Sequence, residues 1–102
     1  MTRNQVTLVG RLGTDAFITT FENGSSVARF NLAVDDGKKS EANKTNFYRI
    51  FAWGNTAEFL TSHCKKGSKI AVSGRLVNRT YVAKTGESRR VSEIEVRQVV
   101  KF

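Results

Sequence analysis

The sequence predicts an all-β fold, a five-stranded antiparallel barrel with one short helix between strands three and four. Hydrophobic and polar residues alternate in several short runs, which is the pattern of half-buried strands. Turn-forming residues separate these runs, and one segment has the hydrophobic spacing of a helix. With 102 residues, 39% of them hydrophobic, the chain can form one core, so we expect a single domain over residues 1–102.

The alternation gives the expected strands in order. They cover residues 4–12, 26–35, 46–53, 68–78 and 90–101. Residues 16–21 are expected to extend the first strand around a bend at Gly13. Glycine tolerates positive φ, so we expect turns at Asn23-Gly24, Asp36-Gly37 and Thr85-Gly86-Glu87.

The expected helix runs from about Asn55 to Cys64. Asn55 is placed to cap its N-terminus, and Glu58 completes a capping-box-like pair. Leu60 and Cys64 belong to its hydrophobic face, and Gly67 can supply a left-handed stop. Three strands, a helix and two strands, with a bend in the first strand, predict the OB-fold, a barrel that removes exposed edges. A pleckstrin-like or open α+β sheet is the alternative.

The charge of the chain indicates its class of partner. A formal net charge of +8 and an isoelectric point near 10.2 favour a polyanion. No segment approaches the ~18 apolar residues of a membrane span, and the first residues lack the apolar core of a signal peptide. The single cysteine, Cys64, fits a reducing compartment, so we expect a cytoplasmic protein without membrane contact.

The third expected strand carries the clearest functional pattern. Alternation places Phe47, Arg49, Phe51 and Trp53 on one face, and Tyr48, Ile50 and Ala52 on the other. Since an uncompensated arginine is costly to bury, we expect the first face to meet solvent or ligand and the second to face inward. Exposed aromatics beside a cation can stack unpaired bases. Alternatively, these aromatics fill a core or a subunit interface, a role we consider most fitting for Phe51.

Two polar segments add positive charge. Residues 79–90 form an expected hairpin in which Tyr81 lies among basic residues, and in OB-folds this connection helps to hold oligonucleotides. Taken alone, such a tip indicates a solvated turn, and its coincidence with the aromatic face of the third expected strand reverses that preference in favour of binding. The net basic loop of residues 37–45 either closes over a nucleic acid or simply connects two strands.

No arrangement of residues indicates catalysis, a metal or a cofactor. His63 and Cys64 are adjacent on the expected helix and point in different directions, so they form neither a metal site nor a catalytic pair. Asp35-Asp36, the one close pair of acids, fits a turn. No glycine loop of the Walker type is present. We therefore expect a binding protein rather than an enzyme.

Short stretches over nearly the whole chain match a known family. They are Val6–Asp15, Asn23-Gly24, Phe30–Ala33, Phe47–Ile50, Trp53-Gly54, Ala57-Glu58, Lys66–Ser68 and Val72–Leu76. In these stretches the sequence resembles the bacterial single-stranded DNA-binding proteins. The resemblance implies an OB-fold, a homo-oligomer that is usually a tetramer built from dimers, and binding of single-stranded DNA without sequence preference in replication, recombination and repair.

The resemblance also implies site residues by position. Phe47, Trp53 and Tyr81 match base-stacking aromatics of the family. Lys38 stands where a further stacking aromatic is expected, so a phosphate contact would replace a stack. With the matching basic positions and the additional charge of Arg3, the expected nucleic-acid-binding residues are Arg3, Lys38, Phe47, Arg49, Trp53, Lys66, Arg79, Tyr81 and Arg89.

Three departures from the family pattern limit what the resemblance implies. Tyr48 replaces a histidine that often lies near the subunit interface, which leaves a dimer as the alternative to a tetramer. Asp15-Ala16 replaces an aspartate-proline pair. The acidic tail that recruits replication and repair proteins has no counterpart here, so that recruitment is not predicted. A dimeric accessory factor like the primosomal replication protein n, an RNA-binding OB module and a protein-interaction module are the alternative functions.

Overall fold

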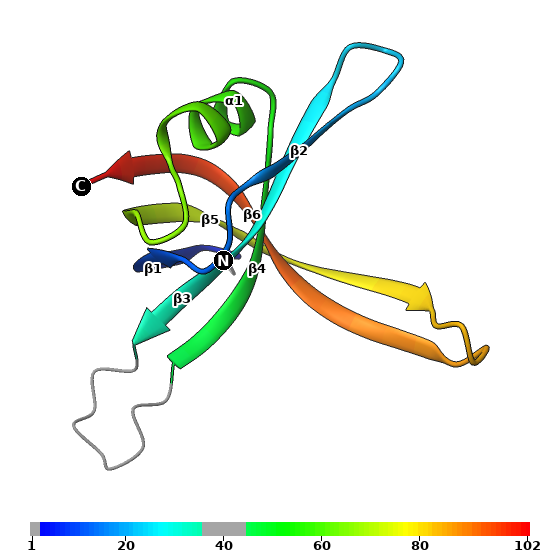
Figure 1. Cartoon of the computed structure of the whole chain (residues 1–102). Coiled ribbons are helices and arrows are strands. Elements are labelled where there is room, and N and C mark those ends of the chain that lie inside the picture. The colour runs from blue at the N-terminus through cyan, green and yellow to red at the C-terminus, as the bar shows by residue number, and fades with distance from the viewer. Residues whose placement is uncertain (1–2, 36–44) are drawn as a thin grey trace.

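The computed structural model describes residues 3–35 and 45–102 of the chain. Within these ranges the elements are β1 (Val6–Leu12), β2 (Phe17–Thr20), β3 (Ser26–Asp35), β4 (Thr45–Trp53), α1 (Gly54–His63), β5 (Lys69–Val82) and β6 (Ser88–Lys101) (Figure 1). None of the helices in the described part of the chain is long and apolar enough to span a membrane.

The strands close into the expected OB-fold barrel. Their order is β1-β5-β6-β4-β3-β2, and an additional pairing of β1 with β3 closes a ring of β1, β5, β6, β4 and β3. A closed ring with an odd number of strands must contain a parallel pair. Here β4 and β6 run parallel, with Ile50 opposite Ile94 and Phe51 opposite Glu95, and the other pairings of the described strands are antiparallel.

The expected extension of the first strand is a separate strand. β1 pairs with β3 as far as Leu12, opposite Leu32, and the chain then bends through residues 13–16. The Gly13 amide donates to the Asn31 carbonyl at 2.7 Å within this bend. β2 then resumes the antiparallel pairing with β3 and lies at the edge of the sheet.

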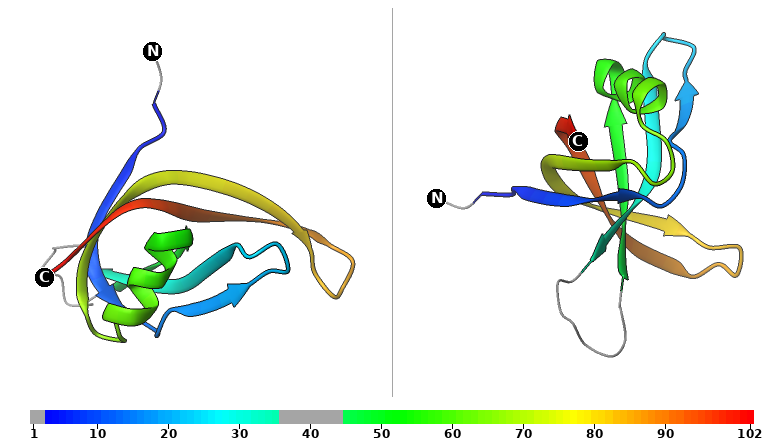
Figure 2. Two further views of the ribbon diagram at one scale, coloured as in Figure 1. Left: turned by 90° about the horizontal axis from the view of Figure 1, so that it is seen from above. Right: turned by 60° about the vertical axis from the view of Figure 1, so that its left-hand side comes forward.

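The hairpin of β5 and β6 is longer than the sequence indicates. Both strands stay paired to Val82 opposite Ser88, and a turn with Gly86 at φ +87° joins them. This outer part of the hairpin projects well beyond the barrel (Figures 1 and 2). Nearer the barrel, a bulge at Ser73/Gly74 brings Gly74 so close to the Glu95 carbonyl that a Cβ atom would collide with it.

Helix α1 packs its hydrophobic face onto the core, as predicted, although its cap differs. The helix begins at Gly54, and the N-cap residue is Trp53, without a side-chain hydrogen bond. The predicted cap by Asn55 is therefore wrong, because Asn55 already lies in the first turn. At the other end Cys64 is buried in the core, and this burial raises the pKa of its thiol, an effect that the charge of Lys101 partly offsets.

Candidate nucleic-acid interface

An open groove lies between the outer face of the β3–β4 sheet and the base of the β5–β6 hairpin. Its volume is about 770 Å³. Residues from β3, β4, β5 and β6 line it, together with Thr14 of the bend after β1. They are Thr14, Arg29, Phe30, Asn31, Arg49, Ile50, Arg79, Tyr81, Val91 and Glu93. The groove is thus rich in arginine and has an aromatic ring on the hairpin side.

The three predicted stacking aromatics are exposed, and one of them, Tyr81, lines the groove. Phe47 is 64% exposed near one end of β4, Trp53 is 45% exposed at the other end, and Tyr81 is 39% exposed on β5. The Trp53 ring packs against Phe21 with 6.2 Å between the ring centroids. Phe51, between them on β4, is buried, which confirms the structural role considered for it. The three exposed rings therefore present surface on which planar ligands can stack.

The predicted basic residues divide into two sets. Arg49 and Arg79 line the groove. Arg89 pairs directly with Tyr81 across the hairpin, and directly opposed residues project on the same face of a sheet, so Arg89 stands beside that ring.

Arg3 and Lys66 are not in the groove. Arg3 lines a separate hollow with Arg75 and Arg97. Lys66 is exposed in the turn after α1, where its backbone amide donates to the Asp15 carboxylate at 2.7 Å. Lys38 lies outside the described residues. The roles of these three residues remain predictions.

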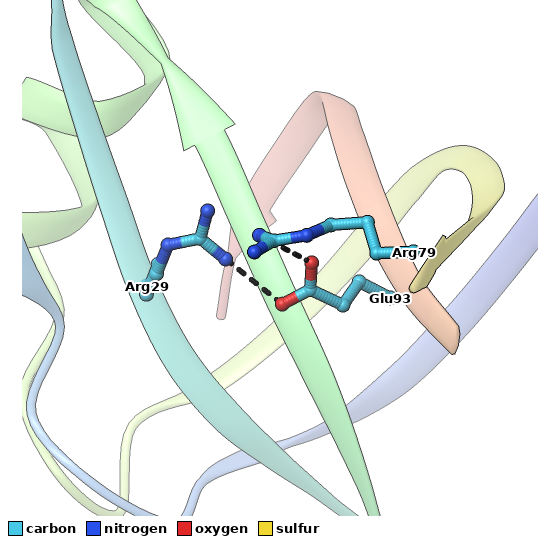
Figure 3. A network of polar contacts seen from close by, with 3 residues as sticks. All are labelled: Arg29, Arg79 and Glu93. Carbon is cyan, nitrogen blue, oxygen red and sulfur yellow. Dashed lines mark hydrogen bonds and ion pairs between the residues drawn. The ribbon is translucent and has the colours of Figure 1, made fainter. Parts of the chain in front are cut away.

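An ion-pair network at the bottom of the groove was not predicted. Glu93 is buried and accepts hydrogen bonds from Arg29 at 2.8 Å and Arg79 at 3.1 Å (Figure 3). The Arg29 guanidinium also lies over the Phe51 ring, 5.3 Å from its centroid. Both arginine side chains stay partly exposed. Because each guanidinium has five N–H donors and gives one to Glu93, the remaining donors are available to an anion.

The prediction for the inward face of β4 is correct for Ile50 and Ala52 and wrong for Tyr48. Ile50 and Ala52 are buried, whereas Tyr48 is exposed. The pairing of β4 with β6 involves Ile50 and Phe51, so Tyr48 lies beyond the part of the ring that β6 covers. Its side chain therefore extends past the core.

Comparison with known proteins agrees with this geometry. The profile of the family described as "Single-strand binding protein family" matches residues 3–102. A protein named Single-stranded DNA-binding protein 3 from Clostridium acetobutylicum is 41% identical over 94% of this chain and 68% of its own length. Single-stranded DNA-binding protein 1 from a Nostoc species is 39% identical over 97% of this chain and 82% of its own length.

The share of the relatives that the chain covers varies. The Single-stranded DNA-binding protein of Malacoplasma penetrans is 35% identical over 94% of this chain, which spans half the length of that relative. Each relative matches almost the whole of the present chain, and the family profile covers the groove and the β5–β6 hairpin. The chain belongs to the single-strand binding protein family.

Proposed function

We propose that this chain binds and protects single-stranded DNA without sequence preference. The observation that carries the proposal is the combination of exposed rings and arginines on one surface. Tyr81 lines the groove with Arg29, Arg49 and Arg79. Phe47 and Trp53 are exposed on the same strand as Arg49, at alternating positions that share its face. Rings of this kind bind the flat face that every base has, and guanidinium groups bind phosphate. Such contacts distinguish unpaired strands from duplexes but do not read base edges.

In this proposal the bases stack on the three exposed rings while the arginines neutralise phosphates. Roughly 1 to 3 kcal/mol per stacked base is typical of such platforms. Arg89 supports the same path from the hairpin, since it stands beside Tyr81. Each released counterion makes the affinity depend on salt, so the logarithm of the affinity falls linearly with the logarithm of the salt concentration.

The wider role of the chain is part of the proposal. Its family consists of binding proteins, and we propose no catalytic activity for it. We further propose that it acts in replication, recombination or repair as a homo-oligomer, with a tetramer favoured over a dimer. The cytoplasmic location and the phosphate contacts of Arg3, Lys38 and Lys66 remain predictions from the sequence.

Tryptophan fluorescence tests the proposal directly. Trp53 is the only tryptophan in the sequence and lies at a proposed stacking position, so its emission reports on the site. During titration with oligo-dT we expect strong quenching at low salt and weaker binding at high salt. Anisotropy of a labelled oligonucleotide provides a second measure of binding. Unchanged emission together with unchanged anisotropy would contradict DNA binding and favour a protein-interaction role for the exposed rings.

A matched RNA strand serves as the competitor in the same assay. Stacking and phosphate contacts do not by themselves distinguish ribose from deoxyribose. Because the relatives of this chain are named single-stranded DNA-binding proteins, we nevertheless expect oligo-dT to be displaced more readily by DNA than by an RNA strand of the same length and corresponding sequence. Preferential displacement by RNA would replace the proposed function with RNA binding.

A further inference from the structure

Phe17, the first residue of β2, is an exposed aromatic residue that the proposed groove does not include. Its side chain is 73% exposed, more than that of Phe47, and every residue of β2 is exposed. A phenylalanine in this position contributes little to the core. Single exposed hydrophobic residues are common, so the exposure alone does not indicate a function.

The strand register places Phe17 in line with the groove. Phe17 lies opposite Arg29 on β3, and Arg29 lies opposite Phe51 on β4. Because directly opposed residues share a face of the sheet, these three residues form a row on the outer face of β2, β3 and β4. Arg29 lines the groove and bonds to Glu93, so Phe17 stands on the same face one strand beyond the groove.

The spacing of this row suits a nucleic acid strand. Neighbouring strands are about 4.8 Å apart, so the backbone of Phe17 is about that distance from the backbone of Arg29. Two residues further along β4, Trp53 lies opposite Val27, and Val27 lies opposite Thr19. The outer face of β2 therefore presents an exposed ring beside an arginine, and it adjoins the position of Trp53. An exposed ring beside an arginine can stack a base while the guanidinium binds a neighbouring phosphate.

We propose that Phe17 is a further base-stacking residue of this chain, and that the DNA strand passes from the groove over Arg29 onto the outer face of β2. The proposal rests on the proposed binding of single-stranded DNA and adds a subsite to it. In this arrangement Arg29 holds a phosphate between a base in the groove and a base on Phe17. Glu93 keeps the Arg29 guanidinium in place for that contact.

Alanine variants test the subsite. We expect Phe17→Ala to weaken the binding of oligo-dT of roughly 15 nucleotides by about fivefold to a hundredfold, the loss of one stack. Phe102→Ala is the matched control, because Phe102 is also exposed and also lies near a cation, Lys69, but is not among the residues that line the groove. The control should bind like the unaltered protein. An affinity of Phe17→Ala equal to that of the control would overturn the proposal.

A relocated tryptophan gives a readout specific to position 17. In the double variant Phe17→Trp/Trp53→Phe, the introduced tryptophan is the sole tryptophan emitter, and we expect oligo-dT to quench it. Phe47→Ala, measured alongside, reports on the stacking proposed for β4. If Phe47→Ala weakens binding and the emission of the relocated tryptophan is unchanged at saturation, the subsite is wrong and the proposed function stands. If the unaltered protein does not bind, the proposed function fails first.

Sedimentation of Phe17→Ala distinguishes DNA contact from contact between copies of the chain. We expect the variant to sediment as the unaltered protein does. A smaller assembly would assign Phe17 to a subunit interface and overturn the proposal. Circular dichroism of the variant is expected to match the unaltered protein, because Phe17 is outside the buried core.

Discussion

At the scale of single residues, the Trp53 ring is both exposed and held in place by a neighbouring ring. Its ring is open on the outer face of β4 and packs against Phe21 at its side. A ring held in this way loses little freedom when a base stacks on it, so more of the stacking energy contributes to affinity. This support is the reason to assign Trp53 a large share of binding.

Trp53→Ala should weaken binding to single-stranded DNA by about 1 to 3 kcal/mol, with similar losses for oligo-dT and mixed sequences, because stacking is sequence-tolerant. Anisotropy titration measures the loss, and circular dichroism checks the fold. An unchanged affinity in a folded variant would remove Trp53 from the site.

Glu93 and Glu95 form a matched pair of acids on β6. Glu93 is bonded to two arginines and its side chain is 8% exposed, whereas Glu95 is bonded to Arg75 and its side chain is 20% exposed. A carboxylate with little access to water depends more on its partners than one with more access. The two residues therefore differ in how much each stabilises the fold.

Replacing either acid by glutamine removes one negative charge, so the overall electrostatic change is the same. Glu93→Gln should lower the free energy of unfolding by about 1 to 2 kcal/mol, because charge-assisted bonds are lost while both arginines keep part of their water. Glu95→Gln should cost below about 1 kcal/mol, as is usual for exposed pairs. Urea unfolding measures both. Equal losses would mean that Glu93 is no more than a surface acid.

At the scale of elements, the β5–β6 hairpin has two distinct faces. Arg89 lies opposite Tyr81, and Arg90 lies opposite Thr80, so the two adjacent arginines project from opposite faces. The face with Tyr81 and Arg89 belongs to the groove, because Tyr81 lines it. Neighbouring residues with the same charge therefore have different expected roles.

Arg89→Ala should reduce the slope of log affinity against log salt by about 0.7, the contribution of one phosphate contact in a single strand. Arg90→Ala makes the same change in net charge and should leave the slope nearly unaltered. Titrations at several salt concentrations give both slopes. Identical slopes in the two variants would show that the hairpin acts through its overall charge alone.

The elements themselves could be predicted where hydrophobic alternation marks them. The strand expected over residues 26–35 has these bounds in the structure, and α1 is displaced by one residue from its expected range. The expected strands stop short of the outer hairpin because residues 79–82 and 88–89 are exposed and lack an inward face that would set a period of two. The predicted cap at Asn55 is wrong because the helix begins one residue earlier, at Gly54, with Trp53 as its N-cap residue.

The site could be predicted only where its residues form a local pattern. Phe47, Arg49 and Trp53 alternate on one strand, so their common face follows from the sequence. The contact between Arg29 and Glu93 joins residues 64 positions apart and depends on which strands become neighbours. Phe17 was missed for the same reason, since its relation to Arg29 arises from the pairing of β2 with β3. A local sequence pattern does not specify which distant strands pair, or in which register they pair.

At the scale of the whole molecule, neighbouring strands of the barrel are paired over very different lengths. β5 and β6 are paired along most of their length, whereas β4 and β6 meet at two residue pairs, Ile50 with Ile94 and Phe51 with Glu95. Ile50 also lines the groove, so this short joint lies where the DNA strand is expected to cross. β1 and β3 also meet at two residue pairs only, so the β4–β6 contact is one of the two shortest pairings of the ring, and it is the one that adjoins the groove.

This joint should be a place where the native barrel opens locally. Amide hydrogens that β4 and β6 present to each other are expected to exchange with deuterium sooner than those in the middle of β5 and β6, because a brief separation there breaks few bonds. A DNA strand bound to the closed form favours that form by mass action. Bound oligo-dT should therefore slow deuterium exchange where β4 meets β6, so that the nucleic acid stabilises the closed form of the barrel that binds it.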